Sequence, residues 1–436
     1  MDKFFPRNTN HTLNPVGKSV IRQDSIAKAL GIATYASDIY KPDTLYAKVL
    51  LSKQPHALIK SIDYKNAEQL PGVKKILTSK DIPGINAYGL AISDQQVLAD
   101  KKVRFIGEPI AVVIAQDAQL AEEAVREIKV EYEPLPAVFD PIAALKKDAP
   151  LVHEKGNLIL RTKVRKGDIA KGLNESDIVV ENLYTLSGQD HASLEPENGI
   201  GWLESDGTLV ICSPSQGVFR ARNQVAQALN IPINRIRVVC PTVGGGFGRK
   251  DDISVEILIG LAVIKTGRPI KLVYSRHEAM LTQTHRHPVI VKARTGVTKK
   301  GKLTFMEGVM YGDTGAYCSL GIFIIKRAAL HLGGPYYYPN YKADSFSVYT
   351  NNPISGAFRG FGVVQAAVVH ESQIDELAQK LSMDPLEFRL MNCFHSGLTT
   401  VTSQVLDEGC GIEATLNKLK EYQYENGIQF GFEKNK

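Results

Sequence analysis

The glycine run Gly244–Gly248 is the sequence feature that most constrains this chain. It reads GGGFG, continues as Arg249-Lys250, and lies between the apolar run 236–243 and the apolar-periodic stretch 253–264. Consecutive glycines let a backbone approach another body closely and take positive φ angles. If a helix begins after the run, its first N–H groups offer a site for a phosphate, pyrophosphate or oxo group. A tight turn fits the run equally well, so its surroundings must decide.

Composition places the chain among ordinary globular proteins. Its 436 residues predict two or three domains, and 44% hydrophobic with 22% charged residues is a common balance. The net charge of +6 comes from scattered basic side chains, so we expect no nucleic-acid partner. No apolar run reaches the roughly 20 residues of a membrane span, and the first residues lack the apolar segment of a secretory signal. We therefore expect no membrane contact.

The cysteines exclude several kinds of site. The five are far apart and form no Cys-x-x-Cys pair. We expect neither an iron–sulfur cluster nor a structural zinc on this chain, and no metal held directly by its side chains. A sparse, odd set of cysteines fits a reducing compartment, so the expected location is cytoplasmic.

Alternating β-rich and helical segments predict an α+β fold. We expect an N-terminal arm at 1–16, a first domain at 17–135, a proline-rich linker at 136–150 and a second domain at 151–436. The clearest predicted elements are strands at 46–51, 73–78, 109–115, 178–186 and 236–243, a hairpin of 289–297 with 303–312, and helices at 118–127, 218–228, 253–266 and 366–381.

Short motifs spread over nearly the whole chain point to one family. They are ATYASD at 33–38, GEP at 107–109, EYEPL at 131–135, GQDH at 188–191, SQ at 215–216, GGGFG at 244–248, GDTGAY at 312–317 and GAFRGFG at 356–362. In this order they resemble the molybdenum-cofactor-binding chain of the xanthine dehydrogenase / aldehyde oxidoreductase family. The resemblance implies an α/β-hammerhead domain followed by the first half of a molybdopterin-binding domain.

The resemblance also implies cofactors and partners. The family binds Mo-molybdopterin, in some members as the cytosine dinucleotide, and oxidises an electron-poor carbon with oxygen from water. Its [2Fe–2S] clusters and FAD lie on other domains or subunits. We therefore expect an iron–sulfur subunit and an FAD subunit as partners.

Five residues match the family's cofactor contacts. Gln216 resembles the glutamine beside the apical oxo ligand, and its amide could donate there while its carbonyl accepts elsewhere; locally it could equally be a strand-end glutamine bonded to backbone. Gly246, Phe247 and Gly248 resemble the cofactor loop, although Phe247 could also be a core aromatic. Arg359 resembles an arginine that binds phosphate or pterin, and its local alternative is a surface turn.

Three residues match the family's substrate contacts. Arg327 resembles the arginine that neutralises charge developing on substrate in xanthine-oxidising members, a catalytic role; locally it could be a solvated helix arginine. Phe361 resembles an aromatic that packs on a heteroaromatic substrate. Asp251 stands where a glutamate contacts purine nitrogen, and it could instead cap the following helix.

Two departures from the family pattern shape the functional hypothesis. Arg249 replaces a glycine and is expected to add charge near the cofactor mouth. The family's glutamate base lies in a Gly-Glu-Pro-like motif late in a longer region, whereas Glu108 belongs to a hammerhead turn and is not expected to be that base. We therefore expect a second molybdopterin-binding subunit to supply the catalytic glutamate.

The hypothesis is that the chain is one part of a split molybdenum hydroxylase that oxidises an N-heterocyclic substrate. Xanthine or another purine comes first among the substrates. A nicotinate dehydrogenase subunit is the alternative, and a non-catalytic assembly or cofactor-storage module is a third hypothesis.

Overall fold

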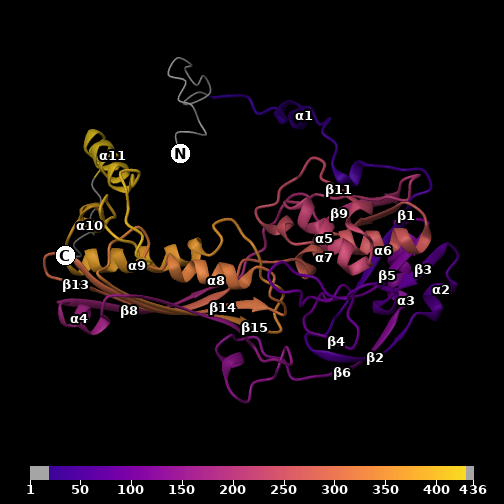
Figure 1. Cartoon of the computed structure of the whole chain (residues 1–436), viewed down its shortest axis with the longest axis horizontal. Coiled ribbons are helices and arrows are strands. Elements are labelled where there is room, and N and C mark those ends of the chain that lie inside the picture. Colours follow the sequence, from indigo (N-terminus) through magenta and orange to yellow (C-terminus); the bar gives the residue numbers. More distant parts are fainter. Residues whose placement is uncertain (1–18, 429–436) are drawn as a thin grey trace.

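The computed structural model describes residues 19–428. The arm predicted at 1–16 lies outside the described residues. Figure 1 shows two bodies of sheet and helix joined side by side along the longest axis, with the short helix α1 (Ser25–Ala29) standing away from both. The mixed α/β content confirms the predicted fold class.

The first body is built on a seven-stranded sheet with the order β11-β10-β9-β12-β1-β5-β3. Its strands are β1 (Leu45–Leu51), β3 (Val73–Leu77), β5 (Pro109–Ala115), β9 (Asn198–Leu203), β10 (Leu209–Cys212), β11 (Ile236–Val239) and β12 (Ile270–Val273). Helices α5 (Val218–Leu229), α6 (Glu256–Thr266) and α7 (Arg276–Thr282) belong to the same body.

This sheet combines strands from both predicted domains. β1 pairs in parallel with β12, with Leu45 opposite Ile270. One hydrophobic cluster contains Val49 of β1, Ile211 of β10 and Ile259 of α6, all buried. The segments before and after the predicted linker at 136–150 therefore share one hydrophobic core. The proposed domain boundaries remain a prediction.

A smaller three-stranded sheet completes the N-terminal region. It has the order β4-β2-β6, formed by β2 (Ala57–Asp63), β4 (Lys102–Val103) and β6 (Lys129–Pro134). Helices α2 (Lys65–Gln69) and α3 (Ala118–Glu127) pack together, with α3 against β1 and β5 and α2 against β3 of the seven-stranded sheet. The carboxylate of Asp117 begins α3 by accepting the N–H of Leu120 at 2.8 Å, an N-terminal cap.

The second body is a five-stranded sheet with the order β7-β15-β14-β13-β8. Its strands are β7 (Leu158–Lys166), β8 (Ile178–Leu186), β13 (Val289–Val297), β14 (Leu303–Gly315) and β15 (Asn340–Tyr349). Helices α8 (Gly321–Leu330) and α9 (Val363–Lys380) lie along one face, with α10 (Pro385–Asn392) and α11 (Ile412–Glu425) beyond them, and α4 (Ile169–Asn174) is on the opposite side (Figure 1). Buried residues of α9, including Val369 and Leu377, join the core over this sheet.

The structure corrects the predicted elements on either side of the glycine run. The strand predicted at 236–243 ends at Val239, because its partner β10 ends at Cys212 and is followed by Ser213-Pro214. Proline has no N–H with which to extend the ladder. The helix predicted from residue 253 begins at Glu256, so the glycine run is separated from α6 by a short 3₁₀ turn, Arg249–Asp251.

Candidate active site

The glycine loop carries a strained Gly-Phe-Gly turn. Gly245 and Gly248 have φ angles of 104° and 109°, and Phe247 between them has φ 56°. Glycine adopts these angles freely, but a bulky side chain rarely does. The Phe247 side chain is 50% exposed, so it is not the core aromatic considered as an alternative. A strained, exposed aromatic in a glycine loop is typical of a binding site.

Gln216 is bound to this loop through its carbonyl. It lies between β10 and α5, and its Oε1 accepts the N–H of Gly248 at 3.0 Å. A Cβ on Gly246 would lie 2.5 Å from that oxygen, so a larger residue at position 246 would displace the Gln216 side chain. Within residues 19–428 no acceptor pairs with its Nε2. The side-chain amide is therefore free to donate outward.

A second Gly-Phe-Gly turn faces the first. Phe361, between Gly360 and Gly362, also has a positive φ, 48°. The N–H of Arg359 donates to the carbonyl of Phe247 at 2.8 Å, and a Cβ on Gly248 would lie 2.4 Å from the carbonyl oxygen of Ala357. The two loops thus touch through their backbones, and the Arg359 side chain remains exposed.

The second loop is held in place by the contacts of Phe358. Its ring stacks on His191 with 4.1 Å between ring centroids, and the guanidinium carbon of Arg286 lies 3.8 Å from its centroid in a cation–π contact. Burial lowers the pKa of His191 to about 4, so the ring is neutral near pH 7 and its Nε2–H donates to the carbonyl of Ala357 at 2.7 Å. Sequence reasoning missed this support, and the pairing of two distant motifs, GQDH and GAFRGFG, was its only signal.

Arg327 reaches the same site from α8. It is exposed, and its guanidinium carbon lies 5.9 Å from the ring centroid of Phe361. A Cβ on Gly362 would lie 2.3 Å from the carbonyl oxygen of Ile324, which shows how closely the second loop packs on α8. Gln216, the glycine loop, Arg359, Phe361 and Arg327 therefore form one chain of contacts across both bodies.

Asp251 does not cap a helix. The N-cap of α6 is Val255, without a side-chain cap. The Asp251 carboxylate instead forms an ion pair with Arg220, in the first turn of α5. Sequence reasoning missed Arg220, which follows Gln216 by four residues.

Arg249 is not a charge at the site mouth, contrary to the prediction. Its side chain is fully buried and forms ion pairs with Asp190 and, at 2.7 Å from Nε, with Glu197. Lys250 is also buried and lies 2.8 Å from the Glu195 carboxylate. Carboxylates more than 50 residues away neutralise these cations, and the linear sequence did not reveal such pairs. Both glutamates near the loop are thereby occupied.

Glu108 lies away from these loops and is a structural residue. It is 1% exposed, and it accepts the hydroxyl of Tyr317, the Nε2 of Gln96 at 3.2 Å and the N–H of Arg104 at 2.5 Å. Burial raises its pKa. The carboxylate thus ties the hammerhead region to the segment after β14.

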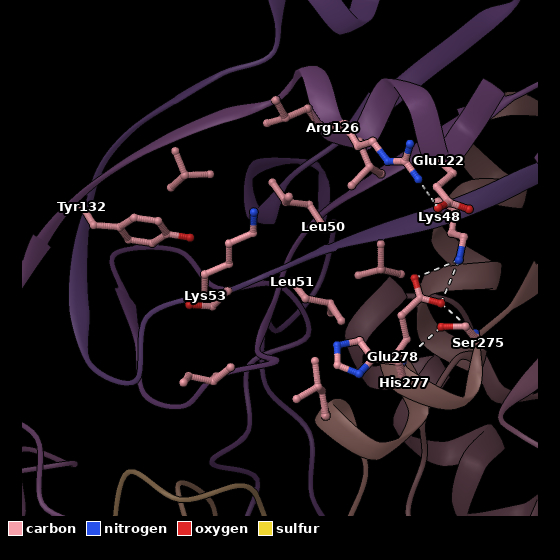
Figure 2. Close-up of a pocket in the computed structure, with 17 residues that line it drawn as sticks. Lys48, Leu50, Leu51, Lys53, Glu122, Arg126, Tyr132, Ser275, His277 and Glu278 are labelled. Carbon is pink, nitrogen blue, oxygen red and sulfur yellow. Dashed lines mark hydrogen bonds and ion pairs between the residues drawn. The ribbon is translucent and has the colours of Figure 1, made fainter. Parts of the chain in front are cut away.

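A cavity of about 810 Å³ lies elsewhere, between β1, α3, β6 and α7. Figure 2 shows Lys48 paired with Glu278 on one side and Tyr132 on the opposite side, with Lys53 between Tyr132 and Leu50. A second cavity of about 570 Å³ is lined by His285 and Arg286, behind the Phe358 loop. Neither lining contains a predicted site residue.

Two negative findings apply to residues 19–428. No group of three or more His, Cys, Asp or Glu side chains there is arranged to hold a metal ion. In the same range, no helix combines the length and apolar character needed to cross a membrane.

Family models match the two parts of the chain. Residues 30–136 match the aldehyde oxidase and xanthine dehydrogenase a/b hammerhead domain, and residues 152–393 match the molybdopterin cofactor-binding domain. The chain belongs to the xanthine dehydrogenase / aldehyde oxidoreductase family of molybdenum-dependent enzymes, as its molybdopterin-binding large subunit.

Similar proteins include one of about the same length as this chain and others about twice as long. The chain is 41% identical to the nicotinate dehydrogenase large molybdopterin subunit of Eubacterium barkeri, over 96% of this chain and 98% of that one. It is 38% identical to a probable xanthine dehydrogenase subunit of Bacillus subtilis, over 86% of this chain and 50% of that protein. The solved aldehyde oxidoreductase of Desulfovibrio gigas aligns with a TM-score of 0.89 at 30% identity, covering 93% of this chain and 46% of that one. The chain thus spans nearly all of one relative and about half of the others.

Proposed function

We propose that this chain forms one wall of a split molybdenum hydroxylase site that oxidises an electron-poor N-heterocycle. A xanthine-type purine is the first substrate class. The observation that carries the proposal is the contact between the two Gly-Phe-Gly turns, bonded from Arg359 to Phe247, with the free amide of Gln216 beside them. These bonds bring the glycine loop, the 356–362 loop and Gln216, which are distant in sequence, next to one another.

The residues present fit a Mo-molybdopterin group. When bound, this cofactor supplies two-electron oxidation with oxygen derived from water. The free Nε2 of Gln216 would donate to an oxygen on the metal. The glycines at 246 and 248 let the loop pack closely against Gln216 and Ala357, which holds that amide beside the loop. The exposed guanidinium of Arg359 would bind phosphate or pterin oxygens in a bidentate manner. The cytosine dinucleotide form of the pterin is part of this proposal.

The substrate would lie between Phe361 and Arg327. A flat heteroaromatic ring packs favourably on the Phe361 ring in an offset or edge arrangement. Arg327, 5.9 Å from that ring centroid, would stabilise negative charge that develops on the heterocycle during oxidation. Preorganised charge of this kind contributes several kcal/mol of transition-state stabilisation. Asp251 would lie at the substrate's far side, held by Arg220.

The base would come from a second molybdopterin-binding subunit. Glu195 and Glu197, beside the loop, are committed to Lys250 and Arg249, and Glu108 is buried in the hammerhead contact. Exposed apolar side chains surround the loops, including Phe219, Phe323 and Val364, which are 69%, 49% and 44% exposed. Such a surface favours coverage by another chain. Iron–sulfur and FAD subunits would carry the electrons onward.

A nicotinate-type substrate is the second candidate. It is supported by the relative from Eubacterium barkeri, whose length matches this chain almost completely. Nicotinate shares the electron-poor ring that Phe361 and Arg327 would accommodate.

The test is made on the complex of this chain with its second molybdopterin-binding subunit. We expect stoichiometric molybdenum and pterin, and oxidation of xanthine or nicotinate. Arg327→Met should lower kcat/KM for the heterocycle by about 10²- to 10³-fold and for an aldehyde far less. Lys326→Met, an exposed neighbour on α8, is the matched control. A complex without molybdenum, or equal losses for heterocycle and aldehyde, would contradict the proposal.

A further inference from the structure

The Arg220–Asp251 ion pair is a feature of the site that the proposed roles leave unexplained. Arg220 lies in the first turn of α5, and Asp251 lies at the end of the 3₁₀ turn after the glycine loop. The Arg220 side chain is 48% exposed and that of Asp251 is 19% exposed. A carboxylate already bound to a guanidinium is a poorer hydrogen-bond partner for a purine nitrogen than a free one.

The pair is the second of two links between α5 and the loop. The first is the bond from Gly248 to Gln216 at 3.0 Å. Arg220 follows Gln216 by four residues and Asp251 follows Gly248 by three, so the ion pair joins the same two segments as the Gln216 bond, a few residues farther along each. A ring whose reacting carbon lies near Gln216 would direct a substituent on its opposite side toward Arg220.

The charges around this position favour an anion. Three arginines that contact or belong to the loops are exposed: Arg220 through Asp251, Arg327 near Phe361, and Arg359. The buried cations Arg249 and Lys250 already have carboxylate partners. Asp251 offsets only one of the three exposed cations. The first N–H groups of α5 have no side-chain cap and add positive potential at the same end.

Arg220 has donors to spare for a ligand. Its Nη2 is bonded to Asp251, and no acceptor among the described residues pairs with its Nε or Nη1. A guanidinium carries five N–H donors in a planar fork suited to a carboxylate. The bond to Asp251 removes rotational freedom from the arginine, so less entropy is lost when a ligand binds.

We propose that Arg220 is a specificity-determining residue that binds a carboxylate on the heterocyclic substrate, and that Asp251 positions it. This inference rests on the proposed function and, within it, favours the nicotinate-type candidate over the xanthine-type purine, because xanthine has no carboxylate for Arg220 to bind. Asp251 then acts through Arg220 and does not contact the ring.

The experiment compares nicotinate with nicotinamide on the molybdenum-loaded complex. The two compounds share the pyridine ring and differ in the carboxylate. Each is measured as a substrate, or as a competitive inhibitor of whichever heterocycle the complex oxidises. The wild-type complex should bind nicotinate more tightly than nicotinamide by about 10- to 100-fold, the usual effect of a charge-assisted hydrogen bond. Raising the salt concentration should reduce that preference, since Arg220 is half exposed.

Substitutions of Arg220 and Asp251 test whether these two residues cause the preference for nicotinate over nicotinamide. Arg220→Met should remove the preference for nicotinate by raising its KM or inhibition constant while kcat changes little, and Arg220→Lys should restore part of it. Asp251→Asn should weaken the preference less than Arg220→Met does. Arg222→Met, on the same helix, should leave it unchanged.

The outcomes separate this inference from the proposed function. A complex that oxidises a heterocycle but binds nicotinate and nicotinamide equally would overturn the inference and leave the proposed function standing. A preference that survives in Arg220→Met would overturn it too. A complex without molybdenum and without oxidation of any heterocycle contradicts the proposed function itself.

Discussion

At the scale of single residues, the site contains both buried and exposed cationic side chains, and the two kinds have different roles. Arg249 and Lys250 adjoin the glycine loop, yet both are buried against carboxylates. Arg327 and Arg359 are more distant in sequence, yet both are exposed at the loop contact. Burial therefore decides which cations hold the loop in place and which can meet a ligand.

Removing the buried cation should destabilise the chain strongly. Arg249→Met leaves Asp190 and Glu197 without their partner, and breaking a buried pair in this way costs about 3–5 kcal/mol in the free energy of unfolding. The measurement is urea unfolding of the chain. Arg237→Met, which breaks an exposed pair with Glu204, is the control and should cost less than about 1 kcal/mol. Equal losses in the two variants would contradict the buried role of Arg249.

Glu108 should matter for stability and not for chemistry. Glu108→Gln replaces a buried acceptor of three donors by an amide that can match only part of them. We expect a loss of about 1–3 kcal/mol in the free energy of unfolding, with unchanged turnover per bound molybdenum in the complex. A loss of turnover at unchanged stability would instead support Glu108 as the base.

At the scale of elements, regular strands and helices were predictable and their irregular ends were not. β5, α3, β8 and β13 have the predicted bounds, because alternation and amphipathic periodicity determine which face is buried. β11 is shorter than predicted because Pro214 ends pairing on its neighbour. The Phe358 support and the Arg220–Asp251 pair arise between residues far apart in sequence, so local patterns carry no signal for them. The site residues themselves were accessible only through family motifs.

The stability contributed by the contact between Asp252, after the glycine loop, and Ser319, before α8, should depend on pH. Burial raises the pKa of Asp252 from 3.8 to about 7, and its carboxylate accepts the hydroxyl of Ser319 at 2.8 Å. A carboxyl with a raised pKa in the folded state binds its proton more tightly when folded than when unfolded. Its contribution to stability is therefore present below about pH 4 and is lost as pH rises toward 7. Asp252→Asn should flatten the change in melting temperature between pH 4 and 7; an unchanged slope would contradict this assignment.

At the scale of the whole molecule, the two matched domains share one sheet. β1 pairs with β12, and buried residues from both regions form a single cluster. The hammerhead region therefore lacks part of its own core when it is separated.

Residues 17–135 produced alone should not fold. Without β12, strand β1 loses its parallel neighbour, and Val49 and Leu77 lose the core residues supplied by α6 and β10. The measurement is the NMR or circular-dichroism spectrum of that fragment, with residues 1–436 as the reference. A fragment with dispersed signals and cooperative unfolding would show that the hammerhead region is independent.

The central claim is that this chain provides only part of a molybdenum hydroxylase site. Its glutamates near the loops are paired with buried cations, and the surface around the loops exposes both apolar side chains and arginines. The most direct test measures oxidation of xanthine and nicotinate by the chain purified alone, supplied with Mo-molybdopterin, and by its complex with the second molybdopterin-binding subunit. We predict turnover by the complex and none by the isolated chain. Turnover by the isolated chain at the rate of the complex would contradict the claim.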